Sequence, residues 1–256
     1  MPQSSLDFAY PWWLSHGHLI LAAVFAATLV AGRVFSWARW LMIVLGLAFI
    51  WAATAATAMH WIGINVVPAL PTQAFLQTGE GRVLDLGAGT GRSSIMVLTE
   101  RPRTSLVALD LFGDSFEHHF GQEGSPEDRL LRNLRVAGVE SRATIQRGDM
   151  LSLPFDADAF DGIVSAYAID HLGRTGAAKA LAEAHRVLKP GGDCLLMLVA
   201  NDRWTKLAFG PLLAHGGTSG VEWWRERAIA AGFDVIEEGT RPATLFLLLR
   251  KPGPRT

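Results

Sequence analysis

The sequence predicts an α/β protein, in which a mostly parallel sheet is covered by helices on both faces and follows a hydrophobic hairpin of two helices. Three observations predict this fold. Only three of the 23 basic and 24 acidic side chains precede residue 68. After residue 81, short apolar runs alternate with helical stretches, as in consecutive βαβ units. The earliest of these runs leads into a glycine-rich segment, where open α/β sheets bind their ligands.

The distribution of charge divides the chain into three parts. Residues 1–67 form the predicted hairpin, residues 68–80 form a linker that contains two prolines, and residues 81–256 form the α/β domain. A single cysteine, Cys194, excludes an internal disulfide framework and a multi-cysteine metal site. The net charge of −1 gives no overall attraction to nucleic acid, so no nucleic-acid partner is expected.

The first part contains two apolar stretches, residues 12–32 and 40–59. Each reaches the roughly 20 residues that a helix needs to cross a bilayer. Tryptophans stand near the ends of both stretches, where their amphipathic rings favour the membrane interface. We therefore expect residues 12–61 to contact the lipid bilayer. The many Ala and Gly residues allow close helix approach, so a homo-oligomer built through these helices is a further expectation.

Two alternatives remain for this region. The stretches can form a buried helical hairpin of a soluble fold or an arm for oligomerisation. A cleaved signal peptide is the other alternative, but the chain starts without a basic segment and the apolar stretch is too long for one.

The second region gives its elements in alternation. Strands are predicted at residues 82–86, 105–110, 143–147, 160–165 and 194–199. Helices are predicted at residues 93–100, 126–137, 177–188 and 221–231. A closing hairpin follows, with strands at 233–238 and 244–249 and a turn at 239–242, and it adds one antiparallel strand to the parallel sheet.

The glycine-rich segment follows the first strand and reads Gly87-Ala88-Gly89-Thr90-Gly91. Glycines there let the backbone turn sharply and approach a ligand closely. The dinucleotide fingerprint requires a glycine at the sixth position, which is Arg92 here, so a nicotinamide cofactor is not predicted. Asp110 ends the second strand, and a carboxylate at that place can accept both hydroxyls of a ribose.

These residues resemble the class I S-adenosylmethionine-dependent methyltransferases over residues 75–250. The resemblance implies a seven-stranded, Rossmann-like methyltransferase sheet and S-adenosyl-L-methionine as cofactor, with S-adenosyl-L-homocysteine as its product. It implies that Asp149 accepts from the exocyclic amine of the adenine and that Met150 packs on the ring. The full set of cofactor-binding residues that it implies is Asp85, Gly87, Ala88, Gly89, Gly91, Asp110, Leu111, Gly148, Asp149, Met150 and Ser165.

Candidate catalytic side chains follow the fourth strand. Methyl transfer from a sulfonium is an in-line displacement, so the protein mainly holds donor and acceptor in line. A base is needed only where the acceptor must lose a proton. Tyr167, Asp170 and His171 are the candidates, and a histidine such as His171 can act as a general base near neutral pH. The alternative for His171 is a residue at a helix start that bonds to backbone.

Candidate acceptor contacts lie in two long segments. After the second strand come Phe112, His118 and His119; after the fifth come Trp204, Trp223 and Trp224. Long loops at the functional face often carry function. The alternatives are a solvated loop for the first segment, and a bilayer-contacting surface or plain packing for the second. No metal site is expected, because no second ligand cluster accompanies the paired histidines.

A small or lipid-soluble methyl acceptor is the class that remains. The segment after the fourth strand, residues 165–168, lacks the Asn/Asp-Pro-Pro-Tyr/Phe motif by which related enzymes methylate amino groups. The predicted function is therefore a membrane-anchored methyltransferase. A non-catalytic, membrane-tethered sensor that binds the same cofactor is the alternative.

The membrane orientation that we expect conflicts with the distribution of positive charge in the hairpin. Arg33 and Arg39 lie in the connection between the stretches, and the positive-inside tendency would place that connection in the cytoplasm. The cofactor is cytosolic, which requires the α/β domain on that side instead. We expect a multi-pass protein of the plasma membrane with the catalytic domain facing the cytoplasm. A hairpin that dips in from the cytoplasmic leaflet is the alternative.

Overall fold

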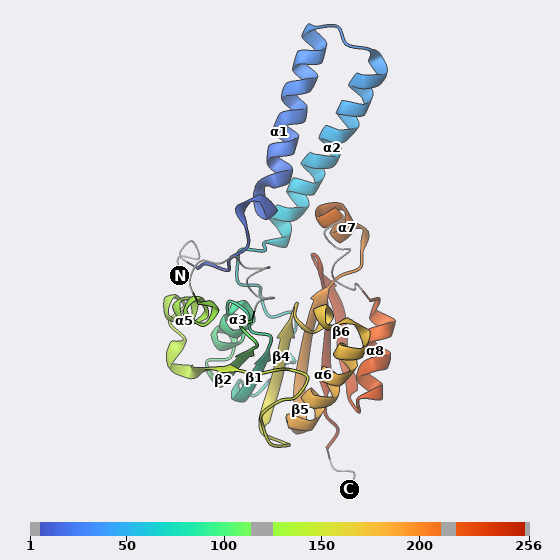
Figure 1. Ribbon diagram of the computed structural model, residues 1–256. Coiled ribbons are helices and arrows are strands. Elements are labelled where there is room, and N and C mark those ends of the chain that lie inside the picture. The colour runs from blue at the N-terminus through green and yellow to red at the C-terminus, as the bar shows by residue number, and fades with distance from the viewer. Residues whose placement is uncertain (1–5, 114–124, 211–218, 254–256) are drawn as a thin grey trace.

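The computed structural model describes residues 6–113, 125–210 and 219–253 as an α/β domain that carries a protruding helical hairpin (Figure 1). The domain is built on a seven-stranded sheet of order β3-β2-β1-β4-β5-β7-β6. β7 pairs antiparallel with both of its neighbours, and the other pairings are parallel. The predicted fold class and the single antiparallel strand are confirmed.

The strands and the helices of the domain keep the predicted alternation. The strands are β1 (Glu80–Leu86), β2 (Arg103–Asp110), β3 (Ala143–Arg147), β4 (Phe160–Ala166), β5 (Leu188–Val199), β6 (Asp234–Arg241) and β7 (Thr244–Arg250). The helices are α3 (Arg92–Glu100), α5 (Pro126–Val136), α6 (Gly173–Val187), α7 (Arg203–Phe209) and α8 (Val221–Ala230), with short 3-10 turns η2 (Glu140–Arg142) and η3 (Ile169–Leu172).

Each face of the sheet has its own core. One core joins α6 and α8 to alternate strand residues such as Leu84, Ile163 and Leu247. The other joins α3 and α5 to the intervening residues, such as Val83 and Val164. This alternation places successive side chains on opposite faces, as the pleat of a strand requires. Both faces of the sheet are thereby buried.

Two predicted boundaries at the end of the domain are wrong. β5 begins at Leu188 and not at Cys194, because Gly191 and Gly192 form backbone hydrogen bonds with Lys251. Residues 239–241 of the predicted turn at 239–242 belong to β6, which continues to Arg241, so the turn is confined to residues 242 and 243. Gly239 is a strand residue that packs against Phe246, and a Cβ there would lie 2.7 Å from the Phe246 ring.

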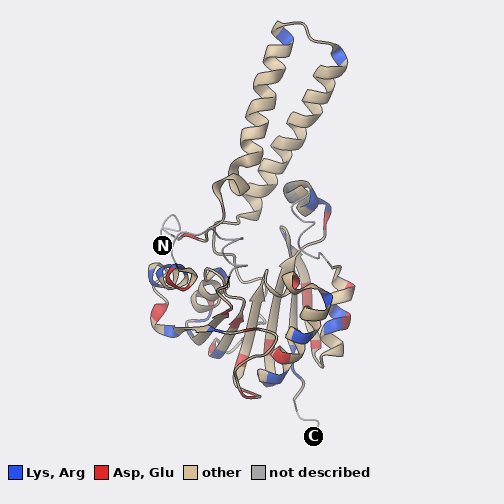
Figure 2. Cartoon of the chain, in the orientation of Figure 1, with Lys and Arg blue, Asp and Glu red and all other residues tan. Residues whose placement is uncertain are grey.

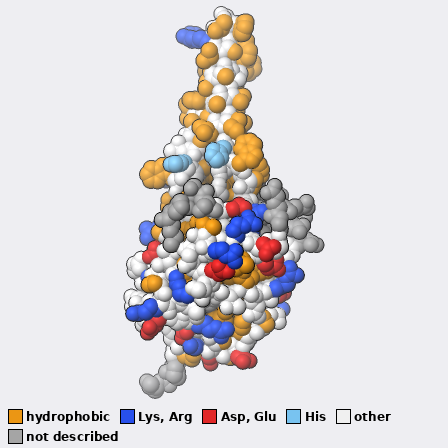
Figure 3. Space-filling view, turned by 90° about the vertical axis from the view of Figure 1, so that its left-hand side faces the viewer, with side chains coloured by type: hydrophobic (Ala, Val, Ile, Leu, Met, Phe, Trp, Pro, Cys, Tyr) orange, Lys and Arg blue, Asp and Glu red, His pale blue; other side chains and the backbone are white. Residues whose placement is uncertain are grey.

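The hairpin consists of α1 (Trp12–Val34) and α2 (Arg39–Ile62), which contact each other along their length. Both helices are long and apolar enough to cross a membrane, and only 6% and 11% of their most apolar windows is buried. Hydrophobic side chains cover the hairpin, while charged side chains gather on the domain (Figures 2 and 3). This exposure does not fit the alternative of a buried hairpin.

The tip of the hairpin differs slightly from the prediction. Arg33 lies in the last turn of α1 and Arg39 is the first residue of α2, so both are helical and only residues 35–38 connect the helices. Gly32 allows the close approach at the tip, because a Cβ there would lie 2.6 Å from the sulfur of Met42.

Segments on both sides of the hairpin pack onto the domain. Phe8, Phe75 and Leu76 are buried in the core that holds α3 and α5. Asn133 of α5 accepts from the Asp7 backbone N–H and donates to the Asp7 carbonyl. The predicted linker thus covers part of the sheet. The segments that precede and follow the hairpin are both packed onto the domain. The domain boundaries themselves stay a prediction.

Candidate functional site

The glycine segment forms a bare backbone cradle at the carboxyl end of β1. Gly87, Gly89 and Gly91 have φ values of 76°, 52° and 90°, in the left-handed region that favours glycine. A Cβ on Gly87 would lie 2.3 Å from the Cβ of Ala168, and one on Gly91 would lie 2.4 Å from Leu130. The backbone N–H groups of Gly87 and Ala88 donate to the Leu109 carbonyl. Side chains are thus excluded where the ends of β1 and β4 meet.

Asp110 lies beside this cradle at the end of β2. Its Oδ2 accepts from the Gly89 backbone N–H at 2.9 Å, and its Oδ1 accepts from the Phe112 backbone N–H at 3.0 Å. Each carboxylate oxygen has further lone pairs, so the group can also accept from ligand hydroxyls. Asp110 therefore lies beside the glycine segment at the end of its strand, and its contact with a ribose stays a prediction.

Asp85 lies beneath the cradle and is fully buried. Its carboxylate accepts hydrogen bonds from the Ser93 and Ser94 hydroxyls in the first turn of α3. Burial raises its pKa to about 6, against the lowering effect of these hydrogen bonds. Asp85 thus holds the start of α3 against β1, and a direct contact with the cofactor stays a prediction.

The segment after β3 closes another side of the cradle. The Gly148 N–H donates to the Asp110 carbonyl, and the Asp149 carboxylate accepts from the Leu151 N–H. The Met150 methyl group would lie 3.0 Å from a Cβ on Gly87, so its side chain lies against the glycine segment. Asp149 and Met150 thus lie beside the glycine segment, and their contacts with an adenine stay predictions.

Two of the predicted cofactor-binding residues, Ser165 and Leu111, differ from the others in their environment. Ser165 is buried, and its hydroxyl donates to the Leu86 carbonyl, which joins β4 to β1. Leu111 is 52% exposed. The strand-end pattern identified the right place in the fold, but it did not specify the direction of these side chains.

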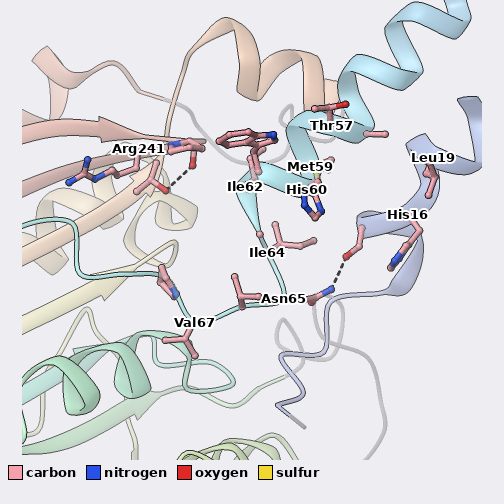
Figure 4. A pocket seen from close by; sticks show the side chains of 18 of the residues that line it. His16, Leu19, Thr57, Met59, His60, Ile62, Ile64, Asn65, Val67 and Arg241 are labelled. Atoms are coloured by element: carbon pink, nitrogen blue, oxygen red, sulfur yellow. Dashed lines mark hydrogen bonds between the residues drawn. The ribbon is translucent and has the colours of Figure 1, made fainter. Parts of the chain in front are cut away.

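A cavity of about 1250 Å³ lies between the hairpin and the carboxyl edge of the sheet. Residues of α1 and α2, such as Leu19 and Met59, line one side, and Arg241 of β6 lines another (Figure 4). The ends of β4, β5 and β7 contribute Tyr167, Met197 and Thr244. The cavity therefore joins the predicted catalytic edge to the membrane-length helices.

Among the three predicted catalytic residues, Tyr167 lines this cavity. Its hydroxyl forms a hydrogen bond with the Thr244 hydroxyl, which itself donates to the Pro242 carbonyl. The Arg92 guanidinium lies 5.8 Å from the centre of its ring. Burial, together with the charge of Asp170, raises the pKa of Tyr167, so this side chain is a neutral hydrogen-bonding group.

Asp170 and His171 lie in the turn that follows. Asp170 is 8% exposed; its Oδ2 accepts from the Val199 N–H, and its Oδ1 has no hydrogen-bond partner among the residues that the structure describes. Burial raises its pKa, although the nearby His171 opposes this. His171 is exposed and does not line the cavity.

The predicted acceptor contacts are mostly elsewhere. Phe112 is 4% exposed and belongs to the core with α3 and α5. Trp224 is a buried residue of α8, and Trp223 packs edge-on against it, near Arg174. Trp204 belongs to α7, which contacts α2. His118 and His119 lie outside the described residues.

The cavity is also lined by Arg92, Arg241 and Thr244, which were not predicted from the sequence. Arg92 donates to the Gly63 and Val66 carbonyls in the segment that follows α2, which ties the hairpin to the start of α3. No motif marks Arg241 or Thr244, because they reach the cavity only when β6 and β7 pair beside β5. Arg92 has one signal, its place directly after the glycine segment.

Comparison with known proteins agrees with this geometry. Residues 83–192 match the family model described as a methyltransferase domain. A protein of Encephalitozoon cuniculi whose name assigns it to the methyltransferases is 30% identical over 204 residues, which cover 70% of this chain and 84% of that protein. A demethylmenaquinone methyltransferase of Roseiflexus castenholzii is 32% identical over 130 residues, which cover 51% of this chain and 48% of that enzyme.

The fold comparison extends further along the chain. An O-methyltransferase family protein from Burkholderia thailandensis superposes with a TM-score of 0.58 at 17% identity, over 82% of this chain and 61% of that one. At that identity the likeness concerns the fold alone. Together with the glycine cradle and Asp110, the relatives show that this chain belongs to the class I S-adenosylmethionine-dependent methyltransferases.

Proposed function

We propose that the protein is a membrane-anchored methyltransferase that acts on a lipid-soluble acceptor. The observation that carries this proposal is the cavity, because it is lined on one side by Tyr167 and Met197 and on the other by helices of membrane-spanning length. Anchoring confines the enzyme and a lipid-soluble acceptor to one thin layer. The cavity connects the proposed catalytic edge of the sheet with the helices that would lie in that layer.

The residues at the cradle fit S-adenosylmethionine. A Cβ on Gly87 would clash with Ala168, so only glycine lets the loop lie this close to the segment after β4, and the Asp110 carboxylate lies at hydrogen-bond distance from the same loop. Asp110 would hold the ribose hydroxyls, the backbone at residues 87–91 would hold the amino-acid moiety, and Asp149 and Met150 would flank the adenine. When bound, the cofactor supplies an electrophilic methyl group on a sulfonium.

Positioning is the main contribution of the chain to the reaction. Correct alignment of two reactants lowers a barrier by about 7–11 kcal/mol. Tyr167 suits this task. When the Thr244 hydroxyl donates to the Pro242 carbonyl, the Tyr167 hydroxyl donates to Thr244. The Tyr167 oxygen can then accept a hydrogen bond from a hydroxyl of the methyl acceptor. Asp170 is the second candidate, with a role in accepting a proton; the exposed His171 is the third.

The relatives favour the lipid-soluble class. Several are named ubiquinone/menaquinone biosynthesis C-methyltransferases, and their names assign them quinones. This chain spans less than half the length of those enzymes, at 48%, 41% and 41%. A quinol-like or phenol-like acceptor is therefore our first choice, without a nucleic acid or a metal in the reaction. Self-association through α1 and α2 is compatible with it.

The hairpin length supports a full span. At 1.5 Å per residue, 23 and 24 helical residues measure about 35 Å, which exceeds the roughly 30 Å hydrocarbon core. Trp12 and Trp61 are exposed at the base, and Trp37 and Trp40 are exposed at the tip. Two aromatic belts fit two interfaces. We propose that the domain faces the cytoplasm and that Arg33 and Arg39 reach the far interface.

Methyl-labelled S-adenosylmethionine tests the proposal. The full chain in lipid nanodiscs is incubated with the label and, separately, with a membrane lipid extract or an aqueous metabolite extract of the source cells. We expect label to enter the organic-soluble fraction. Label in water-soluble products alone would contradict a lipid acceptor, and cofactor binding without label in either fraction would favour the non-catalytic sensor.

A further inference from the structure

The cavity has two chemically different ends. The end within the hairpin is lined by small or apolar side chains, among them Leu19, Ala22, Ala23, Ala26, Ala53 and Ala56. The end at the sheet holds the polar groups of Arg92, Tyr167, Arg241 and Thr244. A ligand that fills the cavity must therefore be amphiphilic, with its polar part at Tyr167.

Alanines create the apolar end. Ala52 and Ala55 are fully buried in the hairpin, where they let α1 and α2 approach each other. The neighbouring Ala53 and Ala56 line the cavity instead. Because the methyl groups are short, a groove remains beside the contact line of the two helices. Its walls belong to the same apolar helices whose outer surfaces are exposed (Figure 3).

The chemistry of the walls selects the occupant. Neither helix has a charged residue between its tip and its base, and the polar side chains that line the groove gather near the base, where Figure 4 shows His16, His60 and Asn65. An extended peptide in such a groove would leave backbone polar groups without partners, which is costly in lipid. A hydrocarbon chain has no such groups and gains from each buried methylene.

We infer that the groove between α1 and α2 binds the hydrocarbon chain of the methyl acceptor, which slides in from the bilayer with its polar head toward Tyr167. This inference rests on the proposed function and adds a second recognition element to it. The polar head of the acceptor would lie at the edge of the sheet, and its hydrocarbon chain would lie in the hairpin. Arg92 connects these two parts of the protein, because its side chain approaches the Tyr167 ring and donates to two carbonyls in the segment after α2.

A photoactivatable probe tests the inference on the full chain in phosphatidylcholine nanodiscs. The probe is a phenol with a pentadecyl chain that carries a diazirine at its far end, and the same phenol without the chain is the competitor. Peptide mass spectrometry locates the crosslinks. We expect them on the lining residues of α1 and α2, and we expect the chainless phenol to compete weakly.

Two alanine substitutions and a matched control sharpen the test. Ala23→Phe and Ala56→Phe place a ring in the groove and should abolish the crosslinks and the methylation of the lipid extract. Ala27→Phe adds the same ring to an exposed position of α1 that does not line the cavity, and it should change neither. The affinity for S-adenosylhomocysteine, measured by calorimetry, should stay unchanged in all three variants, which would show that the domain is folded.

The two proposals fail in different ways. Equal crosslinking of Ala23→Phe, Ala56→Phe and Ala27→Phe, or crosslinks confined to the outer surfaces of the helices, would overturn the groove as a chain-binding site even if lipids are methylated. Absence of label from the lipid fraction of the wild-type protein would overturn the proposed function, whatever the crosslinks show.

Discussion

At the level of single residues, the motifs predicted the positions of some site residues but not the directions of their side chains. Residues 87–91 and Asp110 could be placed from the sequence, because a glycine segment after one strand and an acid after the next are local features that the parallel sheet brings to one edge. The directions of Ser165 and Phe112 could not be predicted. Both side chains turn into the interior because of partners distant in the chain, such as Leu86 for Ser165.

Asp85 makes stability depend on pH. Its pKa is about 6 in the folded protein against an ordinary value of 3.8, so the folded protein binds this proton more tightly than the unfolded chain does. The resulting stabilisation is complete below the ordinary pKa and is lost as the pH rises through 6. Asp85→Asn removes the titration. We expect its unfolding free energy to gain about 2–3 kcal/mol relative to wild type between these limits.

Urea unfolding at several pH values measures this difference. Asp234→Asn, an exposed carboxylate at the start of β6, is the control and should follow the wild-type curve. A wild-type protein and an Asp85→Asn variant whose stabilities change in parallel from below pH 3.8 to above 6 would show that folding does not shift the pKa of Asp85.

At the level of elements, periodicity predicted the order of strands and helices better than their ends. The middle of β5 was predicted, but its beginning was not, since Gly191 and Gly192 extend the strand only by pairing with Lys251. The hairpin helices were predicted from length and apolar composition. Their mutual contact and their fixed base depend on Gly32 and Arg92, whose roles appear only in three dimensions.

The tip of the hairpin provides a test of orientation. Ser36 is exposed between α1 and α2, and the only native cysteine, Cys194, is buried. In intact cells, we expect a membrane-impermeant maleimide to label Ser36→Cys, because a domain in the cytoplasm puts the tip outside.

Ser141→Cys on the exposed surface of the domain is the matched control. It should be labelled only after the cells are permeabilised. Labelling of Ser141→Cys in intact cells would reverse the orientation. Protection of both positions would favour a hairpin that dips into the cytoplasmic leaflet.

In the whole molecule, the cavity combines parts that no single stretch of sequence contains. α1 and α2 supply one wall, and strand ends from β4 to β7 supply the other. The segments at residues 6–10 and 70–76 pack on the face that also carries α3 and α5, so the hairpin is connected to the sheet on both sides. Sequence reasoning treated these segments as ends and linkers, because their partners, such as Asn133, lie far along the chain.

The proposed cofactor site depends most on Asp110 as the group that binds the ribose beside the glycine cradle. Calorimetric titration of the full chain in detergent with S-adenosylhomocysteine tests this directly. We expect saturable binding by the wild type and by the Asp234→Ala control. Asp110→Ala should bind at least about 100-fold more weakly, since two hydrogen bonds to a charged group are lost. Heat absent from the wild type, or an Asp110→Ala affinity equal to it, would contradict the assignment of the cofactor site.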